Sequence, residues 1–319
     1  MGLALAVAFT VVVLLSPAVW SASSAQTSGV ITSLAKDAKC KVGNTPEAPA
    51  YDPANHEVYV PNAGSASVSV VKAPCTVAAT IKLPSGSFPF AAAFDPQNNH
   101  VYVTDSAANA VYVISGTKVI TTLHGFDQPD GLVYDPCQGA MMVTNFEGDN
   151  VSEVSNTTLD QVSLPTGMGP DAIDYNPISG VSGTLNVANY YSSSVTIIDA
   201  CNGATLYTQA VGSNPKGVAY DIEGYCDYVT NFGSGNVTDL ATGGSIKGFD
   251  EPSSATWSQA KLAVYVTNYG SGGLWAIQGN HIVLKISVAK GIIGSAYDDA
   301  NGDIYVTDIL TGTLYVYST

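Results

Sequence analysis

AFDPQNNHVYVTDSAANAVYVI, residues Ala93–Ile114, is built from short runs of β-branched and aromatic residues that stop at turn formers such as Asp95-Pro96. This alternation is typical of short antiparallel strands joined by tight hairpins. The stretch Ala219–Leu240, AYDIEGYCDYVTNFGSGNVTDL, has the same pattern in the same register. The match indicates an internal repeat, which is the first feature to settle in such a sequence.

The repeat occurs seven times along the chain. Aligned on the polar residue that closes the first strand, consecutive copies lie 37 to 45 residues apart. The register residues are Asp52, Asp95, Asp135, Asn176, Asp221, Ser258 and Asp298. A unit of about 40 residues with four short strands has the size of one propeller blade. The sequence therefore predicts an all-β fold, a seven-bladed β-propeller of four-stranded antiparallel blades, as a single domain at residues 26–319.

The two ends of the repeat region complement each other. The seventh unit stops after its third strand, at Tyr317-Ser318-Thr319, and a strand-like segment at 29–42 precedes the first unit. We expect the segment at 29–42 to be the outer strand of the last blade, because this pairing removes an open sheet edge and closes the ring.

The second strand of every unit ends in Asn or Asp. The seven residues are Asn62, Asp105, Asn145, Asn189, Asn231, Asn268 and Asp308. Such a side chain can accept hydrogen bonds from the backbone N–H groups of the turn that follows it. The recurring polar position is therefore predicted to be a turn element first.

A tetrapeptide at the end of this strand carries a family resemblance. Tyr-Val-Thr-Asn or Tyr-Val-Thr-Asp stands at 228–231, 265–268, 102–105 and 305–308, with degenerate forms at 59–62 and 142–145. Residues 30 to 319 thus resemble the YVTN-repeat β-propellers, although the fourth unit departs with Asn186-Val-Ala-Asn189. The resemblance implies a propeller outside the cell, secreted or associated with a surface layer, notably in archaea. It implies little about activity, because propellers host unrelated functions.

The amino end points to export. Residues 2–19 are almost wholly apolar and are followed by a small polar run, which predicts a signal peptide cleaved after Ala25. The alternative is an uncleaved membrane anchor, since 18 apolar residues can just cross a bilayer. Three sequons, at Asn150, Asn156 and Asn236, are candidate glycosylation sites and agree with an extracellular location.

Composition excludes several function classes. The chain has 11 basic and 26 acidic residues, every basic residue is a lysine, and the formal net charge is −15. An acidic surface without a basic stripe repels a phosphate backbone, so we expect no nucleic-acid partner. No nucleophile elbow, phosphate-binding loop or HExxH zinc motif occurs in the sequence.

Charged residues recur where the chain enters each innermost strand. The residue after the proline, or its equivalent, is Glu47, Phe90, Asp130, Asp171, Lys216, Ser253 or Ile293. Three carboxylates and one lysine would therefore ring the channel mouth, where they could act as acid and base or bind Ca²⁺ through hard oxygen ligands. The alternative is a set of solvated loop residues, because propeller mouths are wide and wet. We expect no tightly bound cofactor.

Aromatic residues follow the turn residue in four consecutive units. They are Phe146, Tyr190, Phe232 and Tyr269, and the meander places them on the same face as the charged ring. An exposed aromatic arc would suit sugar stacking or a protein partner. The alternative is that each ring packs against the neighbouring blade.

Five cysteines allow at most two intramolecular disulfides. None has CxxC spacing, so a zinc site is not expected. We expect Cys201 to pair with Cys226, because the outer turn of one blade then meets the first turn of the next.

The sequence thus predicts an extracellular binding or scaffold propeller of the cell envelope or surface layer. Its partner would be an envelope protein or a glycan, recognised by the loop face that carries the ring and the arc. The alternative is an enzyme, a cation-assisted lyase or lactonase-type hydrolase at the channel mouth. The apolar amino end adds possible membrane attachment to these roles.

Overall fold

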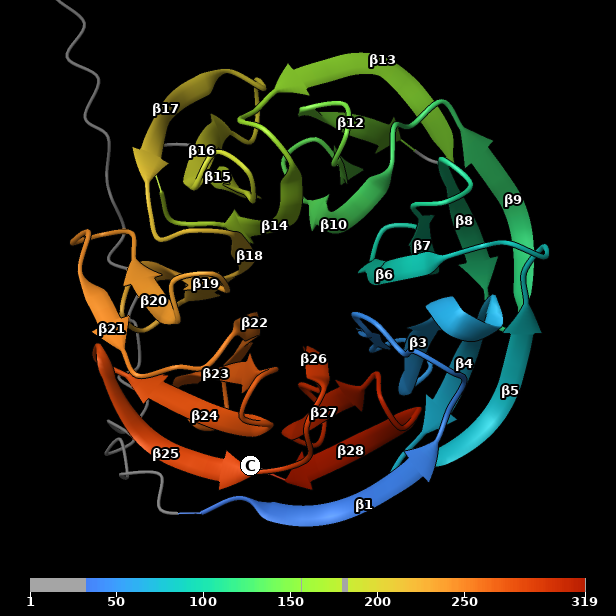
Figure 1. The fold of residues 1–319 in the computed structure, drawn as a ribbon. Helices are drawn as coiled ribbons and strands as arrows, with labels where there is room; N and C mark the ends of the chain where they lie inside the picture. Colours follow the sequence, from blue (N-terminus) through green and yellow to red (C-terminus); the bar gives the residue numbers. More distant parts are fainter. Residues whose placement is uncertain (1–32, 156, 180–182, 319) are drawn as a thin grey trace, which may run out of the picture.

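The computed structural model describes residues 33–155, 157–179 and 183–318 of the chain. Seven four-stranded antiparallel sheets stand around a central axis, and the predicted seven-bladed propeller is confirmed (Figure 1). The predicted signal peptide or anchor at 1–25 lies outside the described residues. Within the described residues, no helix is long and apolar enough to cross a membrane.

The first four blades follow one another along the chain. Blade 1 contains β2 (Ala50–Asp52), β3 (Glu57–Asn62), the 3-10 helix η1 (Ala63–Ser65), β4 (Ser67–Lys72) and β5 (Thr76–Lys82). Blade 2 contains β6 (Pro89–Asp95), β7 (His100–Asp105), β8 (Ala110–Ser115) and β9 (Lys118–His124). Blade 3 contains β10 (Pro129–Asp135), β11 (Ala140–Asn145), β12 (Asn150–Ser155) and β13 (Thr158–Pro165). Blade 4 contains β14 (Pro170–Asn176), β15 (Thr184–Asn189), β16 (Ser194–Asp199) and β17 (Thr205–Ala210).

The last three blades complete the ring. Blade 5 contains β18 (Pro215–Asp221), β19 (Cys226–Asn231), β20 (Asn236–Asp239) and β21 (Ser245–Lys247). Blade 6 contains β22 (Pro252–Ser258), β23 (Ala263–Asn268), β24 (Gly273–Gln278) and β25 (His281–Ser287). Blade 7 contains β26 (Ile292–Tyr297), β27 (Asp303–Asp308) and β28 (Thr313–Ser318), with β1 (Ala35–Lys41) as its fourth strand.

The ring closes as predicted, with the amino-terminal strand β1 antiparallel to β28 on the outside of blade 7 (Figure 1). A disulfide between Cys40 on β1 and Cys75, in the turn before β5, fastens this closing strand to blade 1. The Cα atoms of the two cysteines are 5.5 Å apart. The first and last parts of the described chain are thus joined by both backbone pairing and a covalent bond.

The hydrophobic core lies between neighbouring blades. One cluster, for example, combines Tyr59 and Val70 of blade 1 with Val101 and Tyr112 of blade 2. Tyr59, the first residue of the repeated tetrapeptide, is fully buried, and its hydroxyl donates a hydrogen bond of 2.8 Å to the carbonyl of Gly116. The repeated tyrosine packs its blade against the next one in the five blades that have it.

The recurring Asn or Asp at the end of the second strand has two structural roles. The Oδ1 atom of Asp308 accepts hydrogen bonds from the N–H groups of Leu310 and Thr311 in the following turn, which confirms the predicted turn element there. The Oδ1 atom of Asn62 instead accepts from the N–H of Gly43, at 2.9 Å, in the loop that leads into blade 1. The position ties hairpins and incoming loops together at one face of the ring.

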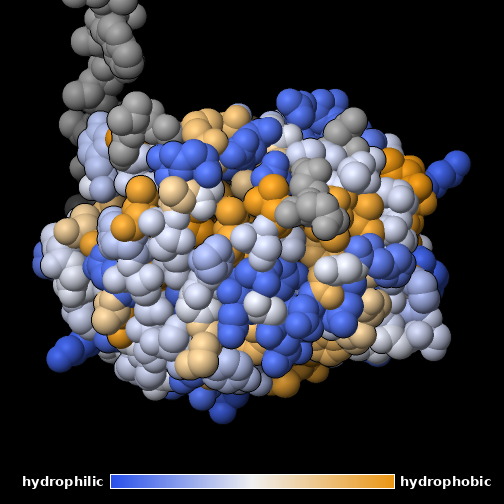
Figure 2. All heavy atoms as spheres, turned by 90° about the horizontal axis from the view of Figure 1, so that it is seen from above, coloured by the Kyte–Doolittle hydropathy of each residue, from blue (hydrophilic) through white to orange (hydrophobic). Residues whose placement is uncertain are grey.

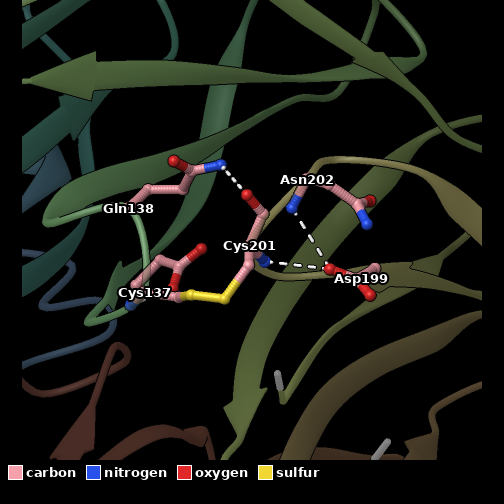
Figure 3. Close-up of a disulfide and its surroundings, with 6 residues drawn as sticks. Cys137, Gln138, Asp199, Cys201 and Asn202 are labelled. Atoms are coloured by element: carbon pink, nitrogen blue, oxygen red, sulfur yellow. Dashed lines mark hydrogen bonds between the residues drawn. A yellow bond between two sulfur atoms is a disulfide. The ribbon is translucent and has the colours of Figure 1, made fainter. Parts of the chain in front are cut away.

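The second disulfide corrects the predicted pairing of Cys201 with Cys226. Cys201 is bonded to Cys137, and the buried Cys226 is reduced. Gln138 Nε2 donates to the carbonyl of Cys201 at 2.8 Å, and Asp199 holds the Cys201 turn through backbone N–H groups (Figure 3). The physical reason is the way neighbouring blades pack. The third hairpin of blade 4 contacts the first hairpin of the preceding blade 3, so Cys201 meets Cys137 and not a cysteine of blade 5.

The outer edge of the ring is mixed in polarity. The outermost strands are exposed along most of their length, as in β17. Figure 2 views the edge over blades 3 and 4, where apolar and polar side chains are interspersed. Large exposed apolar residues on these outer strands include Val162 on β13 and the adjacent Leu206 and Tyr207 on β17.

Candidate functional site

The repeated threonine of the tetrapeptide positions the charged ring. Thr104 on β7 donates a hydrogen bond of 2.7 Å to the carbonyl of Asp130 in the next blade. The hydroxyl of Thr307 reaches the carbonyl of Glu47 in the same way, at 2.9 Å. Thr144 makes the equivalent bond to the Asp171 carbonyl, at 3.3 Å. The threonine of the repeated tetrapeptide thus fixes the backbone from which the ring side chains extend.

Two glycines let neighbouring inner strands approach closely beside this ring. A Cβ atom at Gly131 would lie 2.5 Å from the carbonyl oxygen of Asp171, and one at Gly294 would lie 2.6 Å from that of Glu47. Real Cβ atoms do not come so close to backbone atoms. These positions therefore require glycine, because any other residue would push the neighbouring inner strand away.

The structure brings the predicted ring residues together and buries them. The relative exposures are 6% for Glu47, 5% for Asp130 and 6% for Asp171. The Nζ atom of Lys216 lies 3.2 Å from Asp171 Oδ2, in an ion pair whose side chains are 19% and 8% exposed. The alternative of solvated loop residues is therefore wrong, because these carboxyl groups are removed from bulk water.

Burial dominates the titration of this cluster. It raises the pKa of Glu47 to about 7, although the positive charge of Lys216 acts in the opposite direction. It raises the pKa of Asp130 to about 8, and the negative charge of Asp171 adds to the rise. Burial also raises the pKa of Asp171 against the effect of Lys216. Glu47 and Asp130 can therefore hold protons near neutral pH, when exposed carboxyls are ionised.

The charge of Lys216 is maintained in this setting. Burial lowers its pKa, but Asp171, Glu47 and Asp130 outweigh that effect and raise it above the ordinary value. Lys216 Nζ also lies 5.6 Å from the ring centroid of Phe90, within cation–π distance. The site thus contains one permanent positive charge, on Lys216, which interacts electrostatically with three carboxyl groups.

The predicted aromatic arc is partly packed and partly accessible. Phe146 contacts Tyr190 of the next blade, with ring centroids 6.1 Å apart, and Phe232 contacts Tyr269 at 6.0 Å. All four rings are half-buried. Tyr191 joins the first pair, 5.1 Å from Phe146, and is 59% exposed. The two sequence-based alternatives are therefore both correct in part: the rings contact neighbouring blades and still present a surface.

The ring and the arc meet in one cavity. A cavity of about 300 Å³ is lined by Asp130, Asp171 and Lys216 together with aromatic rings. These rings are Phe90, Phe146, Tyr190, Tyr191 and Phe232. A second cavity of about 160 Å³ in the channel is lined by Glu47, Asp171, Lys216 and Phe90, among others. Three lining residues are thus common to both cavities, whereas Tyr269 lines neither.

Sequence reasoning named Phe90 as a member of the ring but not as a site residue. The structure places it in both cavities and against Lys216. Its position after Pro89 is the signal that could have identified it, because this is the position of the charged residues in other units. For Tyr191, the signal that could have identified it is its position directly after Tyr190, one of the predicted aromatic residues.

The described sequon acceptors are involved in turn structure. Asn150 Nδ2 donates to the carbonyl of Gly148 at 2.6 Å, and Asn236 Nδ2 donates to Ser245 Oγ at 2.7 Å. Attachment of a glycan at either nitrogen would replace one of the N–H donors now available there. Glycosylation stays a prediction at Asn150 and Asn236, and Asn156 lies outside the described residues.

The fold and this site define a class: a seven-bladed β-propeller with an acidic, aromatic-walled cavity at one channel mouth. Solved structures with this fold include virginiamycin B lyase from Staphylococcus aureus, with 12% sequence identity and a TM-score of 0.76 over 90% of this chain and 100% of that chain. Streptogramin B lyase has 13% identity and a TM-score of 0.76, over 90% and 97% of the respective chains. Hydrazine synthase of Kuenenia stuttgartiensis has 15% identity and a TM-score of 0.75, over 88% and 97%.

At these identities the likeness shows the fold alone. No family model matches the sequence, and no curated protein matches it either. Function must therefore be argued from the residues of the site.

Proposed function

We propose that this chain is an extracellular binding propeller that recognises a glycan through the aromatic-walled cavity at its channel mouth. The observation that carries the proposal is the cavity of about 300 Å³ in which Phe146, Tyr190 and Phe232 face Asp130, Asp171 and Lys216. Its volume is that of a small-molecule site, and such sites combine apolar walls with a few polar groups that fix orientation.

The chemistry of the walls suits a sugar ring. The C–H faces of a sugar can stack on aromatic rings, whose faces are apolar and electron-rich. Asp171 and Lys216 can accept and donate hydrogen bonds to hydroxyl groups, and a protonated Asp130 can donate one. A flat protein interface would need about 800 Å² on each partner, which favours a glycan over a protein surface as the occupant of this cavity.

The cellular setting belongs to the same proposal. Two disulfides, Cys40–Cys75 and Cys137–Cys201, support an oxidising compartment, where such bonds form and persist. The apolar amino end and the tetrapeptide resemblance support an envelope or surface-layer propeller of the YVTN-repeat type, cleaved from or anchored by residues 1–25.

A glycan array, followed by isothermal titration calorimetry with the best binder, tests the proposal. Changing Phe232 to alanine, and separately Phe146 to alanine, should each weaken binding at least tenfold, because stacking partners are removed. Tyr225, which is 66% exposed in a first hairpin, provides the control, and its change to alanine should leave glycan binding unchanged. Unchanged binding in both cavity variants would show that the cavity is not the glycan site.

A second candidate, acid–base catalysis, is supported by one observation. Burial raises the pKa values of Glu47 and Asp130 to about 7 and about 8, next to the cation Lys216, so that one carboxyl group can serve as acid and the other as base near neutral pH. This arrangement is compatible with a lyase or a lactonase-type hydrolase.

Two facts weigh against this candidate. A His-to-Ala variant of virginiamycin B lyase from S. aureus is catalytically inactive, whereas no histidine lines either channel-mouth cavity described above. Among the described residues, no group of three His, Cys, Asp or Glu side chains has an arrangement suited to a metal ion.

Turnover assays separate the two candidates. Cleavage of a lactone or of quinupristin that is lost in Glu47→Gln and in Asp130→Asn would establish catalysis. Glycan binding without cleavage of either compound would support the binding role and contradict the catalytic candidate.

A further inference from the structure

A third cavity lies at the end of the blades opposite to the channel mouth. It has a volume of about 260 Å³ and lies between blades 4 and 5. Asp171 is the second residue of β14 and faces the channel mouth, whereas Asn176, the last residue of the same strand, lines this third cavity. We call it the blade 4–5 pocket, and none of the residues of the proposed glycan site lines it.

The floor of the blade 4–5 pocket contains a buried carboxylate. Asp227 is 7% exposed, and its Oδ2 atom accepts a hydrogen bond of 2.7 Å from Asn176 Nδ2 in the neighbouring blade. The Oδ1 atom of Asp227 has no hydrogen-bond partner, and neither has the hydroxyl of Tyr220, which is 7% exposed. Two residues that line the pocket thus each have a buried oxygen atom without a hydrogen-bond partner.

The pocket holds negative charge without a cationic neighbour. No basic residue lines it, and the ion pairs among residues 33–155, 157–179 and 183–318 use Lys72 and Lys216, each with a carboxylate elsewhere. A buried carboxylate without a cationic partner is costly even when an amide donates to it, because burial removes its hydration. A cation that entered the pocket would supply the missing partner.

The rim supplies aromatic faces. Tyr207 on β17 and Tyr225 in the first hairpin of blade 5 both line the pocket and are 55% and 66% exposed. Aromatic faces attract ammonium groups through the ring quadrupole. A combination of exposed tyrosines above a buried carboxylate is therefore suited to an organic cation rather than to an anion.

We propose that the blade 4–5 pocket binds an alkylammonium group, either of a free amine or of a lysine side chain. The three N–H donors of a primary ammonium match the available acceptors, Asp227 Oδ1 and the Tyr220 hydroxyl, and leave one donor for water. The alkyl chain would lie between the rings of Tyr207 and Tyr225. This site is independent of the proposed glycan site.

Isothermal titration calorimetry with n-butylammonium tests the proposal. The measurement is made at pH 8, because burial raises the pKa of Asp227 to about 6 and the carboxylate is then ionised. The neutral control ligand is n-butanol, which has the same chain without the charge. We expect n-butylammonium to bind and n-butanol to bind at least tenfold more weakly. Equal binding of the two, or no binding of n-butylammonium, would overturn the proposal.

Two variants locate the site. Asp227→Asn, which keeps the shape and removes the charge, should weaken n-butylammonium binding at least tenfold. Tyr225→Ala changes an exposed side chain and cannot abolish folding through the core, and it should weaken binding about threefold, the size of an exposed cation–π contact. Phe88→Ala removes an exposed aromatic ring that lines neither proposed site, so it is the control and should bind as the unchanged protein does. Binding that is unaffected in both pocket variants would refute the assignment.

Nα-acetyl-lysine methylamide separates the two sources of the ammonium group. Binding of this compound would identify a lysine side chain of a partner as an acceptable occupant. Binding of n-butylammonium alone would identify a small free amine.

Discussion

Replacing Lys216 by methionine tests the electrostatics of the channel mouth. Methionine has a similar length and no charge, so the variant leaves Asp171 buried beside Glu47 and Asp130 without a cation. The side chains of the ion pair are 19% and 8% exposed, which places it in the buried class. Removal of one partner of a buried pair costs about 3–5 kcal/mol of unfolding free energy.

Protonation of the carboxyl group sets an upper limit to this cost. An aspartate in the unfolded chain has a pKa of about 3.9, and holding its proton costs about 1.4 kcal/mol for each pH unit above that value. The limit is roughly 6 kcal/mol at pH 8 and roughly 1.5 kcal/mol at pH 5. We therefore expect Lys216→Met to lose about 3–5 kcal/mol at pH 8 and no more than about 1.5 kcal/mol at pH 5.

Urea unfolding followed by tryptophan fluorescence at both pH values measures these losses. The double variant Lys216→Met with Asp171→Asn should recover most of the loss at pH 8, because both charges are then absent. Lys72→Met removes a lysine whose side chain is 59% exposed and pairs with Glu57, so it is the control and should change stability by about 1 kcal/mol or less. An equal loss at pH 5 and pH 8, or a double variant no more stable than the single one, would show that lost packing and not charge causes the effect.

Three further predictions concern the whole fold. Replacing Cys40 and Cys75 by serine removes a disulfide that closes a loop of 35 residues, and should lower the free energy of unfolding by about 4 kcal/mol. Calorimetry should show this loss as a lower Tm, and an unchanged Tm would contradict a stabilising role for the disulfide. Because burial raises the pKa values of Glu47 and Asp130 to about 7 and about 8, the folded protein retains protons that the unfolded chain has released. Stability should therefore fall as the pH rises from 5 through 8, and Asp130→Asn should reduce this slope, whereas stability that rises over this range would disprove the assignment. Removal of divalent cations with EDTA should leave the Tm unchanged, and a decrease restored by Ca²⁺ would instead support the calcium site considered from the sequence.

The number and closure of the blades could be predicted because the repeated residues are structural. Tyr59 packs one blade against the next, and Thr307 bonds to the backbone of the following inner strand. Each of these two residues recurs in five of the seven units, so the repeat period predicts the number of blades. The same reasoning placed Glu47, Asp130 and Lys216 at one mouth, because each stands at the same point of its unit.

The repeat could not predict which of the two neighbouring blades the third hairpin of each blade contacts. Each blade has two neighbours, and the spacing of the units treats them alike. The third hairpin of a blade in fact lies against the blade that precedes it, as when Asn280 of blade 6 donates to Asp239 of blade 5 at 2.6 Å. Cys201 therefore meets Cys137, and Cys226 donates instead to the carboxylate of Asp239.

The chemistry of the ring depends on how deeply its side chains are buried and not only on the residue types. Carboxylates at a wide, wet opening would keep ordinary pKa values, and this was the alternative that the sequence left open. Here Gly131 and Gly294 let adjacent inner strands approach so closely that a Cβ atom would collide with the neighbouring backbone. Burial removes water from Glu47 and Asp130, and their raised pKa values follow from that loss. Burial among closely packed inner strands, and not residue type alone, therefore gives this row of acidic residues protons to donate near neutral pH.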